Sequence, residues 1–245
     1  MTALRSPVVE LRQYTLHPGK RDVLIDLFDR EFVESQEAVG ATVLGQFRDL
    51  DDPDRFVWLR GFADMPSRAK ALESFYGGPV WRAHRDEANA TMADSDDVLL
   101  LRPASASGGF AEPVGARPAP GGTAPAPPSL FVATIWYGHV PFDPTFVEFF
   151  QEHVLPVLAE TGGEPLAYLR SEHAVNTFPA LPVRTNEEVF VWFARFTDEA
   201  RLDRHLDRLR HSERWREGVL PTLSERWSRT PQRLRLEPTE RSALR

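Results

Sequence analysis

Three polar side chains near the start of the chain alternate along a segment that is expected to be a strand. Glu10, Arg12 and Tyr14 are spaced two residues apart, and side chains at that spacing point to the same face of a strand. They could line a pocket, in which the arginine holds a carboxylate or enolate and the tyrosine donates a proton to a developing oxyanion. The alternative interpretation is a cross-strand ion pair between Glu10 and Arg12 at a surface or a barrel rim.

A second candidate is His153, which lies within a run of apolar residues at helical spacing. That spacing predicts one broad apolar face, so His153 is expected to be buried or to line a cavity. It could act as a general base or, as a neutral imidazole, ligate haem iron; the alternative is a core histidine bonded to a backbone carbonyl. The apolar residues are Phe146, Phe149, Phe150, Val154, Val157 and Leu158.

The other histidines are weaker candidates. His139 ends an expected strand, and His84 follows Trp81 in an expected helix. The remaining four are expected at surface or turn positions: His17, His173, His205 and His211. No histidine or carboxylate spacing indicates a preformed metal site, so no metal and no cofactor is expected.

A long connection in the second half of the chain holds further candidates. The segment between the second and third strands has seven residues in the first half (49–55) but eighteen in the second (171–188). Its apolar residues gain nothing unless they pack on something. It could cover a cavity with Phe178 and present Asn176 or Arg184 to a ligand, or it could lie against the other half or a second protomer. Tyr168, on the preceding strand, joins Glu10 and His139 as a candidate ligand contact.

Composition excludes several classes of function. The net charge of −7 supplies no basic surface for nucleic acid or an anionic membrane. With no cysteine, thiolate catalysis, disulfides and cysteine-bound metals are excluded. No stretch is apolar enough to span a membrane and the first six residues are no signal peptide, so a cytoplasmic location is expected. The arginine, alanine and proline bias suggests a bacterial source.

The chain contains an internal repeat. The segment 56–62 (FVWLRGF) returns 134 positions later at 190–196 (FVWFARF), and Trp81-Arg82 returns at Trp215-Arg216. The Ala, Pro, Gly and Ser-rich segment 104–128 reads as a linker, which predicts domains at 7–103 and 129–238 and a fraying polar tail at 239–245. Each domain is expected to have the order βαββαβ.

The repeated strand decides the expected architecture, because it is apolar on both faces. Helices can cover one face, and a second sheet must cover the other. Two βαββαβ sheets facing each other form an α+β barrel, whose interior is the expected ligand site. The tryptophans at matching positions of the two halves are expected to pack in repeated cores rather than to stack on a ring-shaped ligand. They are Trp58, Trp81, Trp192 and Trp215.

These motifs resemble the NIPSNAP family. The resemblance rests on the opening segment 10–14 (ELRQY), Pro18-Gly19, the FVW strand and Trp81, and the second half follows the same pattern. It implies tandem ferredoxin-like domains of the dimeric α/β-barrel type, a superfamily that includes cofactor-free monooxygenases, cyclases, isomerases and haem enzymes. In the second half Ala133 and Ile135 are expected to align with Glu10 and Arg12, so the polar group is expected once per chain.

Three hypotheses of function follow. The first is a protein that binds a small apolar or aromatic molecule without a nucleotide, since no glycine-rich phosphate loop is present; it could be an acid–base enzyme in which His153 or Tyr14 moves a proton and Arg12 or Arg184 stabilises negative charge. The second is a non-catalytic adaptor whose barrel is filled by its own side chains. The third is a haem-binding barrel. A homodimer or higher homo-oligomer is expected.

Overall fold

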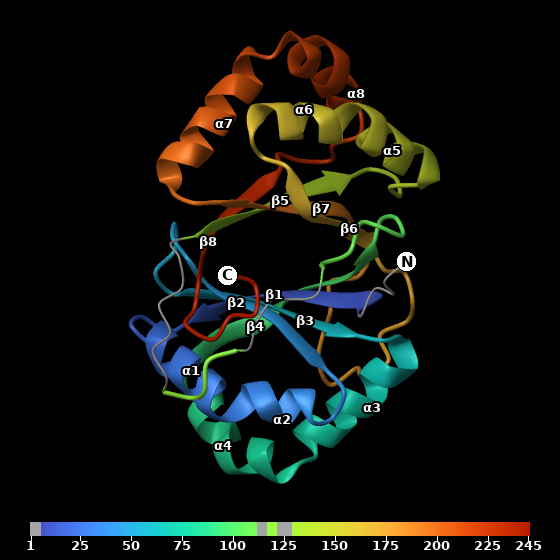
Figure 1. Cartoon of the computed structure of the whole chain (residues 1–245). Coiled ribbons are helices and arrows are strands. Elements are labelled where there is room, and N and C mark those ends of the chain that lie inside the picture. Colours follow the sequence, from blue (N-terminus) through green and yellow to red (C-terminus); the bar gives the residue numbers. More distant parts are fainter. Residues whose placement is uncertain (1–5, 112–116, 122–128) are drawn as a thin grey trace.

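The computed structural model describes residues 6–111, 117–121 and 129–245, and the eight strands of these residues close into one barrel (Figure 1). The first half has the order βαββαβ that the sequence predicts. Its elements are β1 (Val8–Leu16), α1 (Arg21–Leu27), a π-helical turn (Phe28–Phe32), α2 (Val33–Glu37), β2 (Thr42–Asp49), β3 (Arg55–Phe62), α3 (Met65–Tyr76), α4 (Pro79–Asn89) and β4 (Met92–Pro103).

The second half repeats the order. Its elements are β5 (Leu130–Gly138), α5 (Pro144–Phe149), a π-helical turn (Phe150–Val154), α6 (Leu155–Thr161), β6 (Pro165–Ser171), β7 (Glu188–Phe196), α7 (Glu199–His211), a further π-helical turn (Arg214–Val219), α8 (Leu220–Ser224) and β8 (Gln232–Pro238). The α+β fold with two βαββαβ halves is therefore confirmed. No helix among the described residues is long and apolar enough to cross a membrane.

Local sequence signals fix where the main helices begin. The Asp64 carboxylate accepts a hydrogen bond from the Ser67 backbone N–H at 2.6 Å, and Asp198 accepts one from the Arg201 N–H at 2.8 Å. Each aspartate satisfies a backbone donor that the first helical turn leaves free. The two caps are 134 positions apart, so α3 and α7 start at equivalent points of the repeat.

The barrel closes through two short seams between the halves. The strand order is β1-β3-β2-β8-β5-β7-β6-β4. At one seam β2 pairs with β8 from Phe47 opposite Pro238 to Asp49 opposite Leu236, and at the other β4 pairs with β6. The edge strands of each sheet thus pair with edge strands of the other half, so fewer of their backbone groups are left unpaired.

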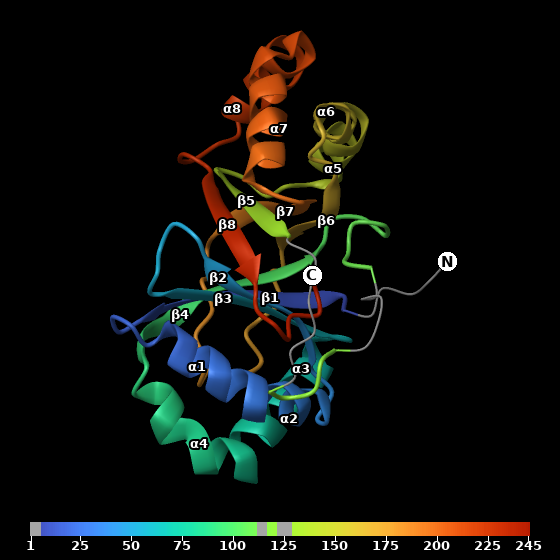
Figure 2. The same cartoon turned by 60° about the vertical axis from the view of Figure 1, so that its left-hand side comes forward.

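The two faces of the repeated strand are covered as expected. Val57 and Leu59 point into the barrel, where they join the central apolar cluster, while Phe56 and Trp58 face the helices of their own half. Figures 1 and 2 show the helices of each half on the outside of its sheet, at opposite ends of the molecule. Both sheets are therefore buried on both faces. That 7–103 and 129–238 are separate domains remains a prediction, because their sheets share one barrel.

The described parts of the linker are docked on the barrel. Backbone hydrogen bonds connect Ala104 and Gly108 with Tyr168 at 3.1 and 2.8 Å. The Phe110 ring lies 5.0 Å from Phe193, and Arg117 donates to the Val43 carbonyl at 2.8 Å. Residues 112–116 and 122–128 lie outside the described residues.

The prediction that the tail 239–245 frays is wrong. The Thr239 and Leu244 backbone N–H groups donate to the carbonyls of Gln46 and Leu44 at 2.9 and 3.0 Å. Ser242 is fully buried, and Leu244 packs against the apolar barrel cluster. The tail therefore runs alongside β2 and is held there, because its backbone N–H groups donate to carbonyls of β2.

Candidate functional site

The two halves place equivalent side chains between the outer face of the sheet and the helices. Arg12 lies opposite Trp58 across β1 and β3, and Thr134 lies opposite Trp192 across β5 and β7. Since Trp192 is the repeat of Trp58, Thr134 is the counterpart of Arg12. The predicted alignment with Ile135 is wrong by one residue, because Ile135 points into the barrel.

The same register gives the remaining counterparts, and they differ in kind. Polar and charged residues of the first half are replaced by apolar or smaller ones in the second. Val132 takes the place of Glu10, Trp136 that of Tyr14, Ala194 that of Arg60 and Leu202 that of Arg68. One location in the fold is therefore filled by charged side chains in one half and lined mainly by apolar side chains in the other, where Thr134, His205 and Arg233 are the polar or charged lining residues.

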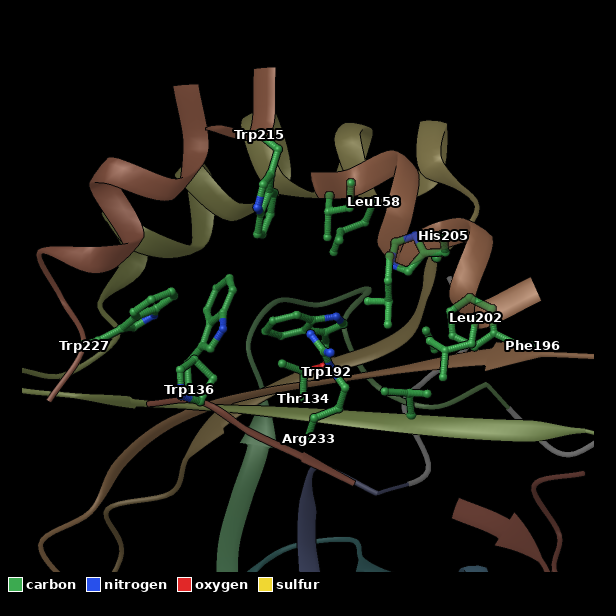
Figure 3. Close-up of a pocket in the computed structure, with 16 residues that line it drawn as sticks. Thr134, Trp136, Leu158, Trp192, Phe196, Leu202, His205, Trp215, Trp227 and Arg233 are labelled. Atoms are coloured by element: carbon green, nitrogen blue, oxygen red, sulfur yellow. The ribbon is translucent and has the colours of Figure 1, made fainter. Parts of the chain in front are cut away.

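In the second half this location is a cavity of about 120 Å³ between the sheet and the helices. Four tryptophans line it. Trp136 and Trp192 rise from β5 and β7, Trp215 descends from the helices, and Trp227 closes one side (Figure 3). The rings of Trp136 and Trp192 lie 4.2 Å apart and nearly perpendicular. His205 of α7 lies on the side of the cavity away from Trp227 (Figure 3).

Two polar atoms at the cavity have no partner. Both the His205 Nδ1 and the Trp227 Nε1 are buried and make no hydrogen bond within the described residues. Burial lowers the pKa of His205, so its imidazole is neutral near neutral pH. Gly163 is required beside it, because a Cβ there would lie 2.3 Å from the imidazole ring. An unpaired buried acceptor and donor are costly unless a ligand or water satisfies them.

His205 was expected at the surface, and that expectation is wrong. The residue is only 7 % exposed. The signal in the sequence was its helical spacing from Leu202, Leu206 and Leu209, which places all four on the inner face of α7. As predicted, the matched tryptophans pack in the cores of the two halves: Trp58 and Trp192 are buried in them, and Trp81 and Trp215 pack against them. Trp192 and Trp215 also line the cavity.

In the first half the same location holds a buried ion cluster. Both carboxylate oxygens of Glu10 accept hydrogen bonds from arginines: Oε2 from Arg12 Nη1 at 2.7 Å and Arg60 Nε at 2.8 Å, and Oε1 from Arg68 Nε at 2.6 Å. Arg12 Nε donates to the Tyr14 hydroxyl at 2.9 Å. The predicted trio is thus brought together, but under the helices rather than at a barrel rim.

Electrostatics fix the charge states of this cluster. Burial by itself would raise the pKa of the Glu10 carboxyl, but the three arginines outweigh it and hold that pKa well below its usual range. Burial raises the pKa of Tyr14 despite the adjacent Arg12. Glu10 is therefore ionised and Tyr14 protonated, which leaves Tyr14 a hydrogen-bond donor rather than a base.

The long connection of the second half reaches across to this cluster. Arg68 Nη1 donates to Asn176 Oδ1 at 2.9 Å and to the Thr177 hydroxyl at 3.2 Å. The Phe178 ring stacks on Tyr76 with centroids 5.8 Å apart. Of the two predicted roles, the contact with the other half is what these bonds form.

Arg184 lies further along the same connection, away from the ion cluster. It forms an ion pair with Asp97 at 3.1 Å and with Glu187 at 2.6 Å. Asn176 and Arg184, predicted together as ligand contacts, both line a depression of about 470 Å³ beside the connection. Any ligand contact of either remains a prediction.

The remaining predicted residues lie apart from both locations. His153 is exposed, so the expectation that it is buried or lines a cavity is wrong. The π-helical turn 150–154 adds a residue to the turn and rotates His153 off the apolar face. His139 is also exposed. Tyr168 is buried, and its hydroxyl is hydrogen-bonded to Gln151 and Ser105, both at 2.8 Å.

The barrel interior, which was the expected ligand site, is filled by apolar side chains of both sheets. At one end the Tyr137 hydroxyl donates to Gln232, which in turn donates to Gln13 at 2.9 Å. An open depression of about 560 Å³ lies outside Tyr137 and Gln232. Packed interiors leave few voids, so a ligand site between the sheets is not supported.

The fold and the paired locations define a dimeric α/β barrel whose two halves belong to one chain. Residues 9–108 match the model of the NIPSNAP family. The first half is therefore similar to the NIPSNAP family, as the resemblance in the sequence implies. No curated protein matches the chain in sequence.

Three solved structures share the whole fold. A "putative monooxygenase" of Lactobacillus acidophilus is 12 % identical with a TM-score of 0.55, and covers 95 % of this chain and 94 % of its own. A "putative monooxygenase" of Fusobacterium nucleatum is 12 % identical with a TM-score of 0.55, covering 97 % and 94 %. An "anthrone oxidase-like protein" is 11 % identical with a TM-score of 0.53, covering 95 % and 91 %. At these identities the likeness is one of fold.

Proposed function

We propose that the protein binds a small apolar or aromatic molecule in the cavity of its second half. The observation that carries the proposal is the cavity of about 120 Å³ lined by four tryptophans. A dry apolar cavity of about 150 Å³ binds benzene in another protein, so a single ring is the appropriate size. The unpaired His205 Nδ1 favours a ligand with one hydroxyl group, which would donate to it.

The test uses toluene and phenol as probes and follows binding by calorimetry. Both are expected to bind, and phenol more tightly because its hydroxyl satisfies His205. Ala194→Leu fills the cavity from the sheet and is expected to abolish both. Trp215→Ala is expected to weaken binding, whereas Trp81→Ala, the same change at the equivalent place of the first half, is the matched control and leaves it unchanged. If neither probe binds, the proposal fails.

An acid–base enzyme is a second candidate. His205 supports it, since a neutral, unpaired imidazole nitrogen beside a cavity can take a proton from an acidic C–H or a phenol. The names of the structural neighbours point to oxidation of organic molecules, and a cofactor-free oxygenation begins with such a proton transfer. His205→Gln is then expected to abolish solvent deuterium exchange into a bound acidic compound while toluene binding persists. Retained exchange would exclude His205 as the base.

The two other hypotheses fare differently. The hypothesis of a non-catalytic adaptor predicts the packed barrel interior. The absence of probe binding in the cavity would favour this hypothesis. Haem does not fit: the cavity has the size of one ring, and the candidate iron ligand His153 is exposed on a helix surface. The expected homo-oligomer remains a prediction, because the barrel is already closed within one chain.

A further inference from the structure

We propose that the first half binds a small anion, a halide or a carboxylate, at the cluster of Arg60, Arg68 and Trp58 beneath the connection 172–188. This goes beyond the proposed function, which concerns the second half. Three arginines, each at most 1 % exposed, surround a single carboxylate. Among the described residues their ion pairs all lead to Glu10, which leaves two positive charges without a partner.

Such an excess is costly in a buried place. Charges taken out of water need pairing, and an uncompensated buried charge costs several kcal/mol or more. The neighbouring phenol does not supply a second negative charge, because burial raises the pKa of Tyr14. Gln36 and Asn176 offer Arg60 and Arg68 only neutral oxygens, at 3.0 and 2.9 Å. A bound anion is the remaining source of compensation.

The cluster also has free donors. Arg60 Nη2, Arg68 Nη2 and Trp58 Nε1 are buried and make no hydrogen bond within the described residues. They belong to side chains in mutual contact: Arg60 and Arg68 share Glu10, and the Arg60 guanidinium lies over the Trp58 ring at 5.1 Å. Guanidinium and indole N–H groups are donors only. The group that satisfies them must be an acceptor, and the excess charge makes it an anion.

The second half supports this location independently. The equivalent positions there enclose a cavity rather than a packed core, so this part of the fold can hold a guest. In the first half buried arginines occupy the equivalent place, so any guest there must be small. The connection 172–188 covers it, with Asn176 and Thr177 on Arg68 and Phe178 on Tyr76.

The first experiment uses bromide and acetate as probes. Crystals soaked in sodium bromide are expected to show an anomalous peak at the cluster. Above the dissociation constant, a tenfold rise in bromide or acetate should raise the folding equilibrium constant by up to about tenfold. Arg68→Met should lose most of this dependence. Arg170→Met is the matched control, since Arg170 is also partly unpaired but lies in the second half, and it removes general salt effects from the comparison.

A response to bromide alone assigns a halide site, and a response to acetate as well assigns a carboxylate site. The absence of an anomalous peak together with equal salt dependence in wild type and Arg68→Met would overturn the proposal. Toluene binding in the second half should be unaffected by Arg68→Met, so failure here is distinguishable from failure of the proposed function.

A second variant supplies the anion from the chain itself. Asn176→Asp places a carboxylate where Arg68 now meets a neutral amide. If the cluster lacks negative charge, this variant is more thermostable than wild type and at least tenfold less responsive to bromide. Asn186→Asp, which adds the same charge elsewhere in the connection, is the control and should do neither. Destabilisation by Asn176→Asp with an unchanged bromide response would show that the cluster is satisfied without an anion.

Discussion

One carboxylate organises most of the buried charge of the first half. Glu10 is fully buried and is the common partner of three guanidinium groups. Charged hydrogen bonds of this kind are strong, but their net effect on stability includes the cost of removing every partner from water. Removing the carboxylate alone leaves that cost without compensation, which makes Glu10 the residue whose loss should matter most.

Glu10→Gln is accordingly expected to lower the free energy of unfolding by about 3 to 5 kcal/mol, the cost of breaking a buried ion pair. Urea denaturation measures it. Glu160→Gln is the matched control: Glu160 pairs with Arg214 while 61 % exposed, and exposed pairs contribute about 1 kcal/mol or less. A loss for Glu10→Gln no larger than for the control would contradict the account of the cluster.

Asp29 carries a pH dependence of opposite sign to that of Glu10. Burial raises the pKa of Asp29 to about 6, so the folded state holds this proton more tightly than the unfolded chain. Its contribution to stability is complete below about pH 4 and is lost as the pH rises through 6. Asp29→Asn should remove this loss and stabilise the protein at pH 7.5 by about 1 to 3 kcal/mol.

The measurement is the free energy of unfolding from pH 4 to pH 7.5. The variant keeps an amide oxygen to accept the hydrogen bond of Gln46, so packing is little changed. Asp26→Asn, at an exposed position on α1, is the control and should parallel the wild type. If the stability of Asp29→Asn depends on pH in the same way as that of the wild type, the raised pKa of Asp29 is wrong.

At the scale of elements, the connection 172–188 ties the halves together outside the barrel. Phe178 and Leu181 pack against the cluster around Phe62 and Leu72 on the first half. The sequence indicates such a contact, because exposed apolar residues in a long loop need a surface on which to pack. It could not name the surface, since that depends on how the second sheet is oriented over the first.

Phe178→Ala is expected to cost about 1 to 2 kcal/mol, from lost stacking on Tyr76 and lost apolar burial. It should also raise amide exchange within 172–188. Val175→Ala in the same connection is the control, because Val175 is 85 % exposed and should change nothing. Unaltered exchange in Phe178→Ala would mean that the connection is held by its polar bonds alone.

The strands were predictable, and so was most of the apolar face of the helix at 144–160, but not the position of His153. The alternating residues at 10, 12 and 14 and the repeated segment 56–62 were expected on strands, and they lie in β1 and β3, because a two-residue period carries no cumulative error. The helical period fails at the π turns, and this misplaced His153. Apart from Arg12 on the same strand, the partners of Glu10 come from β3 and α3, 50 and 58 positions away, and nothing in a single sequence connects them with it. The cavity of the second half arises because Val132, Ala194 and Leu202 replace the larger charged residues of the first half.

At the scale of the molecule, each half depends on the other to cover the inner face of its sheet. The apolar barrel cluster draws on strands of both sheets, while direct strand pairing between halves is confined to the two short seams. Apolar packing rather than backbone pairing therefore holds the barrel closed. Among the described residues, the helices of each half lie on the outer face of its sheet and cover none of the inner face (Figures 1 and 2).

Residues 1–121 and 129–245, produced as separate chains, are consequently expected to assemble one to one when co-expressed. Each alone should form homodimers or precipitate, since its sheet would expose the inner face. Light scattering after gel filtration gives the stoichiometry. A stable, soluble monomer of either fragment would show that the inner face does not need its companion.

The joining of both halves in one polypeptide also bears on how the sites can change. In a symmetric homodimer every substitution occurs twice, so a cavity cannot lose its charges on one side only. Here Glu10 and Val132 occupy matching places under separate codons. The first half can keep its buried ion cluster while the second half acquires a cavity for a ligand. Selection can then act on each half without changing the other.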